Sequence, residues 1–342
     1  MANRVWEDRE IKFDIPNIHK KLRNGENILE IIDSVEDTKG NSGDLGQLVI
    51  TNIRLIWFSL TNTKFTLSIG FFTIVTMNTK NVISTLRGST DALYILTSTP
   101  KQRFEFIFTD YGANQKHFGS LFEIYKIYQS TTLYRELKLR GAILTEGHLN
   151  ILRQEQVYTI LNGVYNLSSD QGNLGTFIIT NIRLVWYAEA NESFNISLPY
   201  MQMISLRIRE SKYGLALVIQ TGPNAGNYVL GFRVDPQEKL HEVHKELISL
   251  HSVYSETPIF GVNYDIKALN KTEDMLRIDD ISEIDNEASS EINSKFTAYL
   301  SEEDREEHRE PFYCKELGFA MEKLRDGYTI KDLWNVMGTT TR

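Results

Sequence analysis

The sequence has little cysteine and no long hydrophobic run. Cys314 is the only cysteine in 342 residues, so no disulfide can form within the chain, and a reducing compartment is expected. The most apolar stretch, residues 65–77, is interrupted by Thr, Ser and Gly and is shorter than the roughly 20 apolar residues of a membrane helix. The N-terminus has neither the basic nor the apolar region of a secretory signal. We therefore expect a cytosolic protein.

Motifs of enzyme chemistry are also absent. The glycine-rich stretch 39–46 lacks the Lys and the following helix of a nucleotide-binding loop, and it is predicted to be a β-hairpin loop. Cys314 has no His or second Cys at a catalytic spacing. His241 and His244 share a predicted helix, but no third metal ligand lies nearby, so a solvated helix face is favoured. We expect no catalysis, cofactor, metal or small-molecule substrate.

Negative charge is concentrated in one part of the chain. The net charge is −8, and residues 273–310 hold 14 Asp or Glu against 4 Lys or Arg, which leaves about +2 for the remainder. No basic stripe with interleaved aromatic residues is present, so nucleic acid is not an expected partner. Residues 258–310 are predicted to be an acidic, flexible linker, although 258–261 still looks packed.

A long internal repeat organises the sequence. Residues 46–57 read GQLVITNIRLIW, and residues 175–186 read GTFIITNIRLVW, an offset of 129. Residues 86–96 align with 208–218 at an offset of 122, so the first copy carries a longer insertion before that point. Because the register holds over many elements, the chain is predicted to be a duplication of one domain.

Each copy is predicted to be mainly β with one closing helix. Short β-branched and aromatic runs separated by turn residues predict strands at 28–35, 47–51, 54–59, 65–69, 93–97 and 104–109. Helical spacing follows at 118–128 and 240–254, the latter opened by Asp235-Pro236. Asn52 and Asn181 are expected in tight turns, because Asn tolerates left-handed backbone angles. About seven strands and a helix predict two tandem pleckstrin-homology-like barrels, residues 5–136 and 137–257.

The repeated signature resembles that of GRAM-type and GLUE-type members of the pleckstrin-homology superfold. Further segments, such as SVEDTKGNSGDLGQL, LRGSTDALYIL and ELGFAMEKLRDGYTIKDLW, are similar to those of the Bardet–Biedl family of BBSome coat subunits. The resemblance implies assembly with other BBSome subunits and recruitment to phosphoinositide membranes of the phosphatidylinositol 3-phosphate class. It also implies roles in cilium assembly and ciliary membrane-protein trafficking, at the basal body and ciliary membrane. The alternative is a stand-alone phosphoinositide sensor.

Basic residues at the barrel rims are the candidate contacts for anionic lipid. The usual headgroup pocket of pleckstrin-homology domains surrounds the first hairpin loop, where this sequence offers only Lys39. Arg207 and Arg209 share strand parity and lie roughly 7 Å apart, followed by Lys212. Lys80 and Arg87 occupy the comparable part of the first copy. Any contact is expected to be weak and electrostatic, and plain surface solvation is the alternative.

Arg54 and Arg183, within the signature, are predicted to be structural. Strand alternation places Arg54 on the face opposite Leu55 and Trp57, so its stem packs while its head reaches water or a loop carboxylate. Direct contact with a ligand is the alternative.

Residues 311–342 are predicted to form a helical docking segment. The apolar residues expected to contact a partner are Leu317, Phe319, Met321, Leu324 and Trp334. A short amphipathic helix is marginal alone and needs a groove. Both barrels already have a closing helix, so we expect docking on a partner, with packing between the barrels of the same chain as the alternative.

Overall fold

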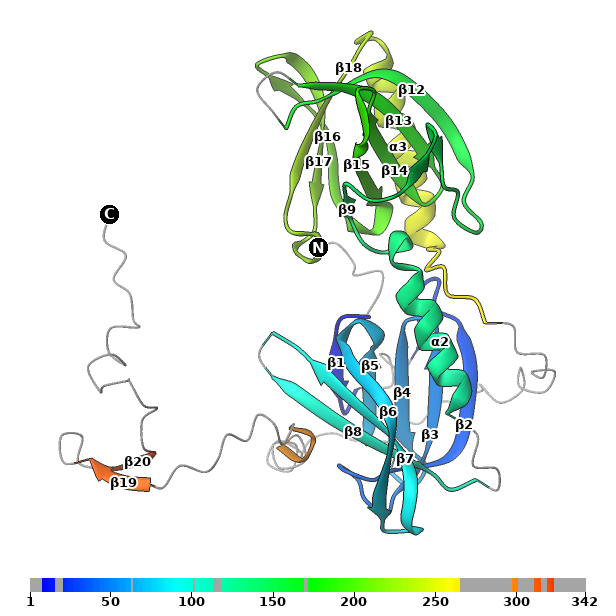
Figure 1. Ribbon diagram of the computed structural model, residues 1–342, viewed down its shortest axis with the longest axis vertical. Coiled ribbons are helices and arrows are strands. Elements are labelled where there is room, and N and C mark those ends of the chain that lie inside the picture. Colours follow the sequence, from blue (N-terminus) through cyan, green and yellow to red (C-terminus); the bar gives the residue numbers. More distant parts are fainter. Residues whose placement is uncertain are drawn as a thin grey trace.

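The computed structural model describes residues 8–15, 21–62, 64–100, 102–112, 118–168, 172–264 and 297–300, and the backbone of 311–314 and 319–322. Two β domains follow one another along the chain, and Figure 1 shows helix α2 leading from the first toward the second. No helix in these ranges is long and apolar enough to cross a membrane.

The first domain is an eight-stranded antiparallel sheet with one helix. Its strands are β1 (Ile11–Phe13), β2 (Ile28–Asp37), β3 (Leu45–Thr51), β4 (Arg54–Ser59), β5 (Thr66–Gly70), β6 (Ile74–Ser84), β7 (Gly88–Ser98) and β8 (Arg103–Asp110). Their order is β1-β5-β4-β3-β2-β8-β7-β6, with only three residue pairs joining β2 to β8. Helix α2 (Gly119–Ser130) buries Leu121, Ile124 and Tyr128 in the core. The six expected strands and the closing helix are confirmed, and β1 and β6 are additional strands at the two edges of the sheet.

The second domain repeats this plan. Its strands are β9 (Lys138–Leu139), β12 (Val157–Asn166), β13 (Asn173–Thr180), β14 (Arg183–Ala188), β15 (Asn191–Pro199), β16 (Met203–Ser211), β17 (Gly214–Thr221) and β18 (Val229–Val234). The order β16-β17-β18-β12-β13-β14-β15-β9 places each strand where its counterpart lies in the first sheet. A small hairpin of β10 (Leu144–Thr145) and β11 (His148–Leu149) precedes it. The duplication predicted from the sequence is therefore a duplication of topology and register.

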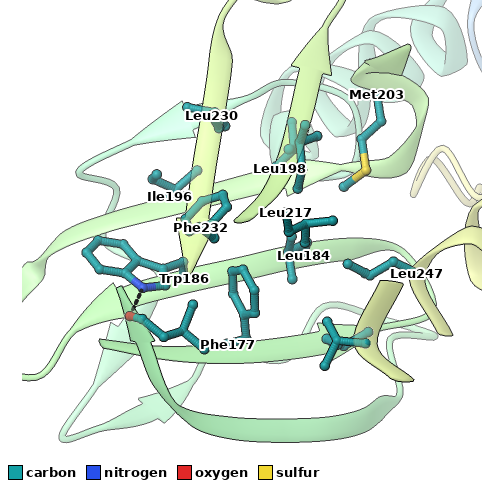
Figure 2. Packing of buried hydrophobic residues seen from close by; sticks show 14 of the residues in the cluster. Phe177, Leu184, Trp186, Ile196, Leu198, Met203, Leu217, Leu230, Phe232 and Leu247 are labelled. Carbon is teal, nitrogen blue, oxygen red and sulfur yellow. Dashed lines mark hydrogen bonds between the residues drawn. The ribbon is translucent and has the colours of Figure 1, made fainter. Parts of the chain in front are cut away.

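The cores of both domains are organised around the tryptophan of the repeated signature. Trp57 Nε1 donates to Val35 O at 2.9 Å, and Trp186 Nε1 donates to Val164 O at 3.0 Å. Figure 2 shows Trp186 among aromatic and aliphatic side chains from several strands. A buried indole N–H needs an acceptor, and the same strand supplies it in each copy.

The Thr-Asn turns are present, but for a different reason from the one expected. Thr51 Oγ1 accepts from Arg54 N at 3.0 Å, and Thr180 repeats this with Arg183 N at 3.0 Å. Asn52 is not in a left-handed conformation; its amide instead bridges Asn27 N and Gly25 O. The turn is thus fixed by side-chain hydrogen bonds to backbone groups.

Helix α3 (Lys239–Glu256) begins later than the sequence indicated. Asp235 N donates to Gly163 O at 2.9 Å directly after β18, and the N-cap of α3 is Glu238, so Asp235 does not cap the helix. The buried face of α3 carries Leu240, Val243 and Leu247, as predicted from their spacing.

Two parts of the predicted linker are packed against the rest of the chain. After α3, Val262 is buried in the core of the first domain, and Phe260 O accepts from Arg135 Nη1 at 2.7 Å. Helix η5 (Thr297–Tyr299) also lies on the first domain, where Tyr299 is buried. The packing expected at residues 258–261 is present, whereas Tyr299 is packed within a stretch predicted to be flexible, because its hydroxyl contacts the buried carboxylate of Asp37.

The C-terminal segment contains a β-hairpin where a helix was predicted. Strand β19 (Pro311–Cys314) pairs with β20 (Phe319–Glu322), with Phe312 opposite Met321. Short apolar runs suit either structure, and the aromatic residues of this one favour strands. Phe319 and Met321 therefore lie on a strand, whereas Leu317, Leu324 and Trp334 lie outside the described residues.

Candidate functional site

The arginine of the signature forms a buried ion pair in each domain. Arg54 Nε donates to Glu26 Oε1 at 2.7 Å and Nη2 to Glu26 Oε2 at 3.0 Å, with both side chains fully buried. Nη1 also donates to Ser68 Oγ at 3.3 Å. Glu26 is the loop carboxylate that the sequence hypothesis required, while contact with water is excluded by burial.

The second domain reproduces the pair almost atom for atom. Arg183 Nε lies 2.7 Å from Glu155 Oε1, and Nη2 lies 2.9 Å from Oε2. Ser197 Oγ accepts from Nη1 at 3.1 Å. A guanidinium that holds a carboxylate in two-point contact and a hydroxyl, away from solvent, has a structural role. The repeated signature therefore explains the fold and does not itself form a ligand site.

A tyrosine from the distant tail occupies a specific site on the first domain. We call this the tyrosine site; it consists of Phe13, Asp37, Gly40, Asn41 and Phe106. The hydroxyl of Tyr299 donates to Asp37 Oδ2 at 2.5 Å and accepts from Asn41 Nδ2 at 2.8 Å. Its ring centroid lies 5.2 Å from that of Phe13 and 5.3 Å from that of Phe106.

The electrostatics of this site tie the tyrosine to the carboxylate. Burial raises the pKa of Asp37, although hydrogen bonds from Tyr299, Asn41 and Gly40 partly oppose the shift. Burial and the adjacent Asp37 raise the pKa of Tyr299, so its hydroxyl keeps its proton and remains a donor. Sequence reasoning missed this site, because no pattern joins residue 299 to residue 37.

Lys39, the sequence candidate in the first hairpin loop, is engaged within the chain. Its Nζ forms an ion pair with Glu105 Oε2 at 2.5 Å and lies 3.5 Å from Leu300 O. Both side chains of the pair are largely buried. Lys39 is thereby held by Glu105 of β8, next to the residue that follows Tyr299.

Arginine side chains gather on the outer face of β16 to β18 in the second domain. Arg207 and Arg209 are exposed and alternate along β16, opposite Val218 and Ala216 of β17. On β18, Gly231 pairs with Val218, and Arg233 follows two residues later on the same face. Arg233 was not predicted; the alternation of β18 next to β17 is the signal that identifies it. We call Arg207, Arg209 and Arg233 the basic face.

The other lipid candidates have their own surroundings. Lys212, at the β16–β17 turn, lies with Nζ 4.9 Å from the Tyr213 ring centroid. Lys80 Nζ lies 3.3 Å above the Tyr94 ring in the first domain. Arg87 donates to Gly112 O at 2.9 Å and lines a pocket of about 650 Å³. The candidates of the two copies therefore belong to separate domains and form no single cluster.

Two of the three histidines of α3 contact the neighbouring strand β16, whereas His241 is exposed, as expected from the sequence. His244 Nε2 lies 3.2 Å from Leu206 O, and His251 Nε2 lies 3.2 Å from Met203 O. Burial lowers the pKa of His251. Within the described ranges, no group of three or more His, Cys, Asp or Glu side chains is placed to hold a metal ion.

Two protein-family models match the two domains. Residues 26–130 match the N-terminal pleckstrin-homology-like domain of the Bardet-Biedl syndrome 5 protein, and residues 138–264 match its second such domain. The chain belongs to the Bardet-Biedl syndrome 5 family. The second match ends at Tyr264, the last residue described after α3.

Similarity to members of the Bardet-Biedl syndrome 5 family extends over nearly the full length. The chain is 48% identical over 335 residues to "BBSome complex member BBS5" of Danio rerio, covering 98% of each chain. It is 47% identical to the Homo sapiens protein of that name over 337 residues, covering 97% and 98%. The Caenorhabditis elegans protein "BBSome complex member bbs-5" is 43% identical, with 97% of each chain covered. These matches confirm the family and the tandem fold predicted from the sequence.

Proposed function

We propose that this protein is a non-catalytic subunit of the BBSome, which contributes two pleckstrin-homology-like domains to the coat. The observation that carries the proposal is the match of 43–48% identity to proteins named as BBSome complex members, over both domains and the tail. By that relation we assign it to ciliary membrane-protein trafficking and cilium assembly, at the basal body and ciliary membrane. Purification of the tagged chain from ciliated cells should recover the other BBSome subunits, and their absence would overturn the proposal.

The membrane-facing part of the proposed function is weak binding to phosphoinositides through the basic face. Arg207 and Arg209 on β16 and Arg233 on β18 are exposed on one face, with β17 between the two strands, and Lys212 lies at the β16–β17 turn. A basic residue near an anionic surface contributes about 1 kcal/mol, so this set supports weak, salt-sensitive attraction. Lys39 is not part of it, because Glu105 and Leu300 O already hold its ammonium group.

Vesicle sedimentation tests this surface. Vesicles containing phosphatidylinositol 3-phosphate should bind the wild-type chain at low salt and release it as salt rises. The triple variant Arg207→Ala/Arg209→Ala/Arg233→Ala should bind about 100-fold more weakly, since three contributions of about 1 kcal/mol are removed. Lys80→Ala, at the position of the first domain that matches Arg209, is the control and should change little. Tight, salt-resistant binding would instead favour a stand-alone lipid sensor.

The C-terminal region is proposed to contact partner subunits. Its β19–β20 hairpin pairs only with itself among the described strands, and an isolated two-stranded hairpin is marginal in water. A chain lacking residues 311–342 should therefore unfold at an unchanged temperature but associate less with the coat. A drop of several degrees in the melting temperature would show that the segment belongs to the fold of the two domains.

A further inference from the structure

The tyrosine site has the properties of a recognition site for a peptide, and its occupant comes from the same chain. Between residues 265 and 310 the structure describes only 297–300, and those residues lie on the first domain. We propose that the tyrosine site is a peptide-binding site for a tyrosine followed by an aliphatic residue, with residues 297–300 as its exchangeable intramolecular ligand. This binding site is separate from the basic face of the proposed function.

The site selects tyrosine over other aromatic residues. Only 2% of Tyr299 is exposed, and the hydroxyl meets an acceptor in Asp37 and a donor in Asn41. Phenylalanine would fill the ring position but would leave the buried Asp37 carboxylate without one of its donors. A phosphorylated tyrosine would bring a second negative charge against Asp37. The ligand chemistry is therefore an unmodified phenol.

The main chain beside the tyrosine is recognised as well. Leu300 forms an antiparallel bridge with Phe104 at the start of β8, and its carbonyl oxygen lies 3.5 Å from Lys39 Nζ. Glu105, the next residue of β8, anchors that lysine. Residues 297–299 form one turn of 3-10 helix, so the ligand is a short turn whose tyrosine enters the pocket and whose next residue bridges to the start of β8.

Gly40 supports the interpretation that the site is built around this ligand. Its backbone is not in the left-handed region, so its conformation does not demand glycine. A Cβ atom at this position would fall 1.8 Å from Cζ of Tyr299, nearer than any non-bonded contact allows. The missing side chain is thus explained by the bound tyrosine rather than by the turn.

The matched positions of the second domain lack this chemistry. Register places Asn166 where the first domain has Asp37, and Asn166 Oδ1 accepts from Ser168 N within its own loop. Leu139 occupies the position of Phe13, because Leu139 pairs with Ile196 in the same way as Phe13 pairs with Leu67. Leu139 is 46% exposed. Since the duplicated fold survives without these residues, the aromatic rings and the carboxylate of the first domain are not needed for the fold itself.

Binding of an added peptide measures the exchange. The probe is a fluorescein-labelled peptide of residues 294–302, SKFTAYLSE, added to the full-length chain. A ligand on the same chain acts at an effective concentration on the order of millimolar. If the added peptide binds with a Kd of about 0.1 mM, the wild-type chain should bind it about tenfold more weakly than Tyr299→Ala, whose own ligand is removed.

Two further arms make the result specific. A probe peptide with Phe in place of the tyrosine should bind Tyr299→Ala at least tenfold more weakly. The double variant Gly40→Ala/Tyr299→Ala should lose binding, because the new Cβ fills the ring position. Equal binding by the wild-type chain and Tyr299→Ala, no binding by Tyr299→Ala at millimolar peptide, or unchanged binding by the double variant would each overturn the proposal.

A second variant covers the case in which Tyr299→Ala does not fold. Tyr299→Phe keeps the ring packing against Phe13 and Phe106 but loses the hydroxyl. The added tyrosine peptide should then displace the weakened intramolecular ligand and bind this variant several-fold more tightly than the wild-type chain. Binding no tighter than that of the wild-type chain would contradict the proposal. Vesicle binding through the basic face should be unchanged in every variant, which separates the two proposals.

Discussion

The two domains have nearly identical interiors and different borders. Both contain the buried Arg–Glu pair, the tryptophan hydrogen bond and the threonine turn. The first domain also includes residues from distant parts of the chain, since Val262 and Tyr299 belong to its core and Tyr264 and Leu300 pack against it. Among the described residues, the core of the second domain is drawn from residues 134–254, with Ile259 packed against it. The comparison indicates that the two copies kept the buried hydrogen bonds and the ion pair that stabilise the fold. The copies differ in the segments that pack against the outside of each sheet.

One matched pair of positions shows that the residue type at the edge of a domain depends on the segment packed against it. Gly70 and Pro199 occupy the same place, paired with Arg54 and Arg183 respectively. A Cβ atom on Gly70 would lie 2.2 Å from Asp8 O, because the N-terminal segment crosses there. The second copy accommodates a full proline ring at that point. Glycine at position 70 is therefore explained by the N-terminal segment at Asp8 and not by the strand.

The shared interior is tested by removing each signature arginine. Arg54→Ala should destabilise the first domain by about 3–5 kcal/mol, because Glu26 is left buried without its partner. Arg183→Ala, the matched variant, should destabilise the second domain by a similar amount through Glu155. Calorimetry or urea unfolding with domain-specific probes measures both effects. Losses below about 1 kcal/mol, or an equal loss in both domains from either variant, would break the comparison.

The first domain should also have a pH dependence from Asp8 that is opposite in sign to the one that the lowered pKa of His251 gives the second domain. Burial raises the pKa of Asp8 from 3.8 to about 6, against the opposing hydrogen bond from Tyr128 and the charges of Arg9 and Arg135. The folded state therefore binds this proton more tightly than the unfolded state. Stability from Asp8 rises as pH falls from about 6 toward 4, and at neutral pH the buried charge costs up to about 3 kcal/mol.

The variant Asp8→Asn isolates that contribution. Relative to the wild-type chain, the variant should be favoured at pH 7.5, and its advantage should shrink or reverse near pH 4.5. Urea unfolding of both chains at the two pH values measures the difference, with the transition of the second domain as internal control. A wild-type advantage that grows with pH would contradict the assigned pKa direction.

The Gly70 contrast gives the next largest effect. Gly70→Ala should cost about 1–3 kcal/mol, because the new methyl group forces the backbone of Asp8 and Arg9 away from β5. The control is Gly119→Ala at the start of α2, where a Cβ atom meets nothing within 4 Å. That change should be neutral or slightly stabilising, since alanine is the better helix former. Equal effects of the two substitutions would show that the N-terminal segment does not press on Gly70.

Local patterns predicted the fold well, and contacts between distant segments explain the misses. Strand alternation and the repeat located six strands of the first domain and both closing helices, and of the two contacts predicted for Arg54, water or a loop carboxylate, the carboxylate is found. The tyrosine site could not be found this way, because residues 37 and 299 are far apart and Tyr299 lies in an acidic stretch. The predicted helix is wrong at residues 319–322, which form a strand, because a short apolar run fits a strand equally well.

The smallest predicted effect concerns two basic residues at matched positions. Lys80 of β6 and Arg209 of β16 occupy the same register, each opposite an alanine of the next strand. Lys80 Nζ lies 3.3 Å from the centroid of the Tyr94 ring, and Tyr94 in turn donates to Glu105. A cation over an aromatic ring at an exposed site contributes about 0.5–1 kcal/mol. Lys80 should therefore act mainly on stability, and Arg209 mainly on binding.

A crossed experiment separates these roles. Lys80→Ala should destabilise the first domain by about 0.5–1 kcal/mol while changing vesicle binding less than about twofold. Arg209→Ala should change stability by less than about 0.5 kcal/mol, as expected for an exposed position, but weaken vesicle binding about fivefold, the equivalent of about 1 kcal/mol. Thermal unfolding and vesicle sedimentation of the same two samples give all four values. If Lys80→Ala weakens vesicle binding as much as Arg209→Ala does, both domains face the membrane, and the division between a membrane-binding second domain and a peptide-binding first domain fails.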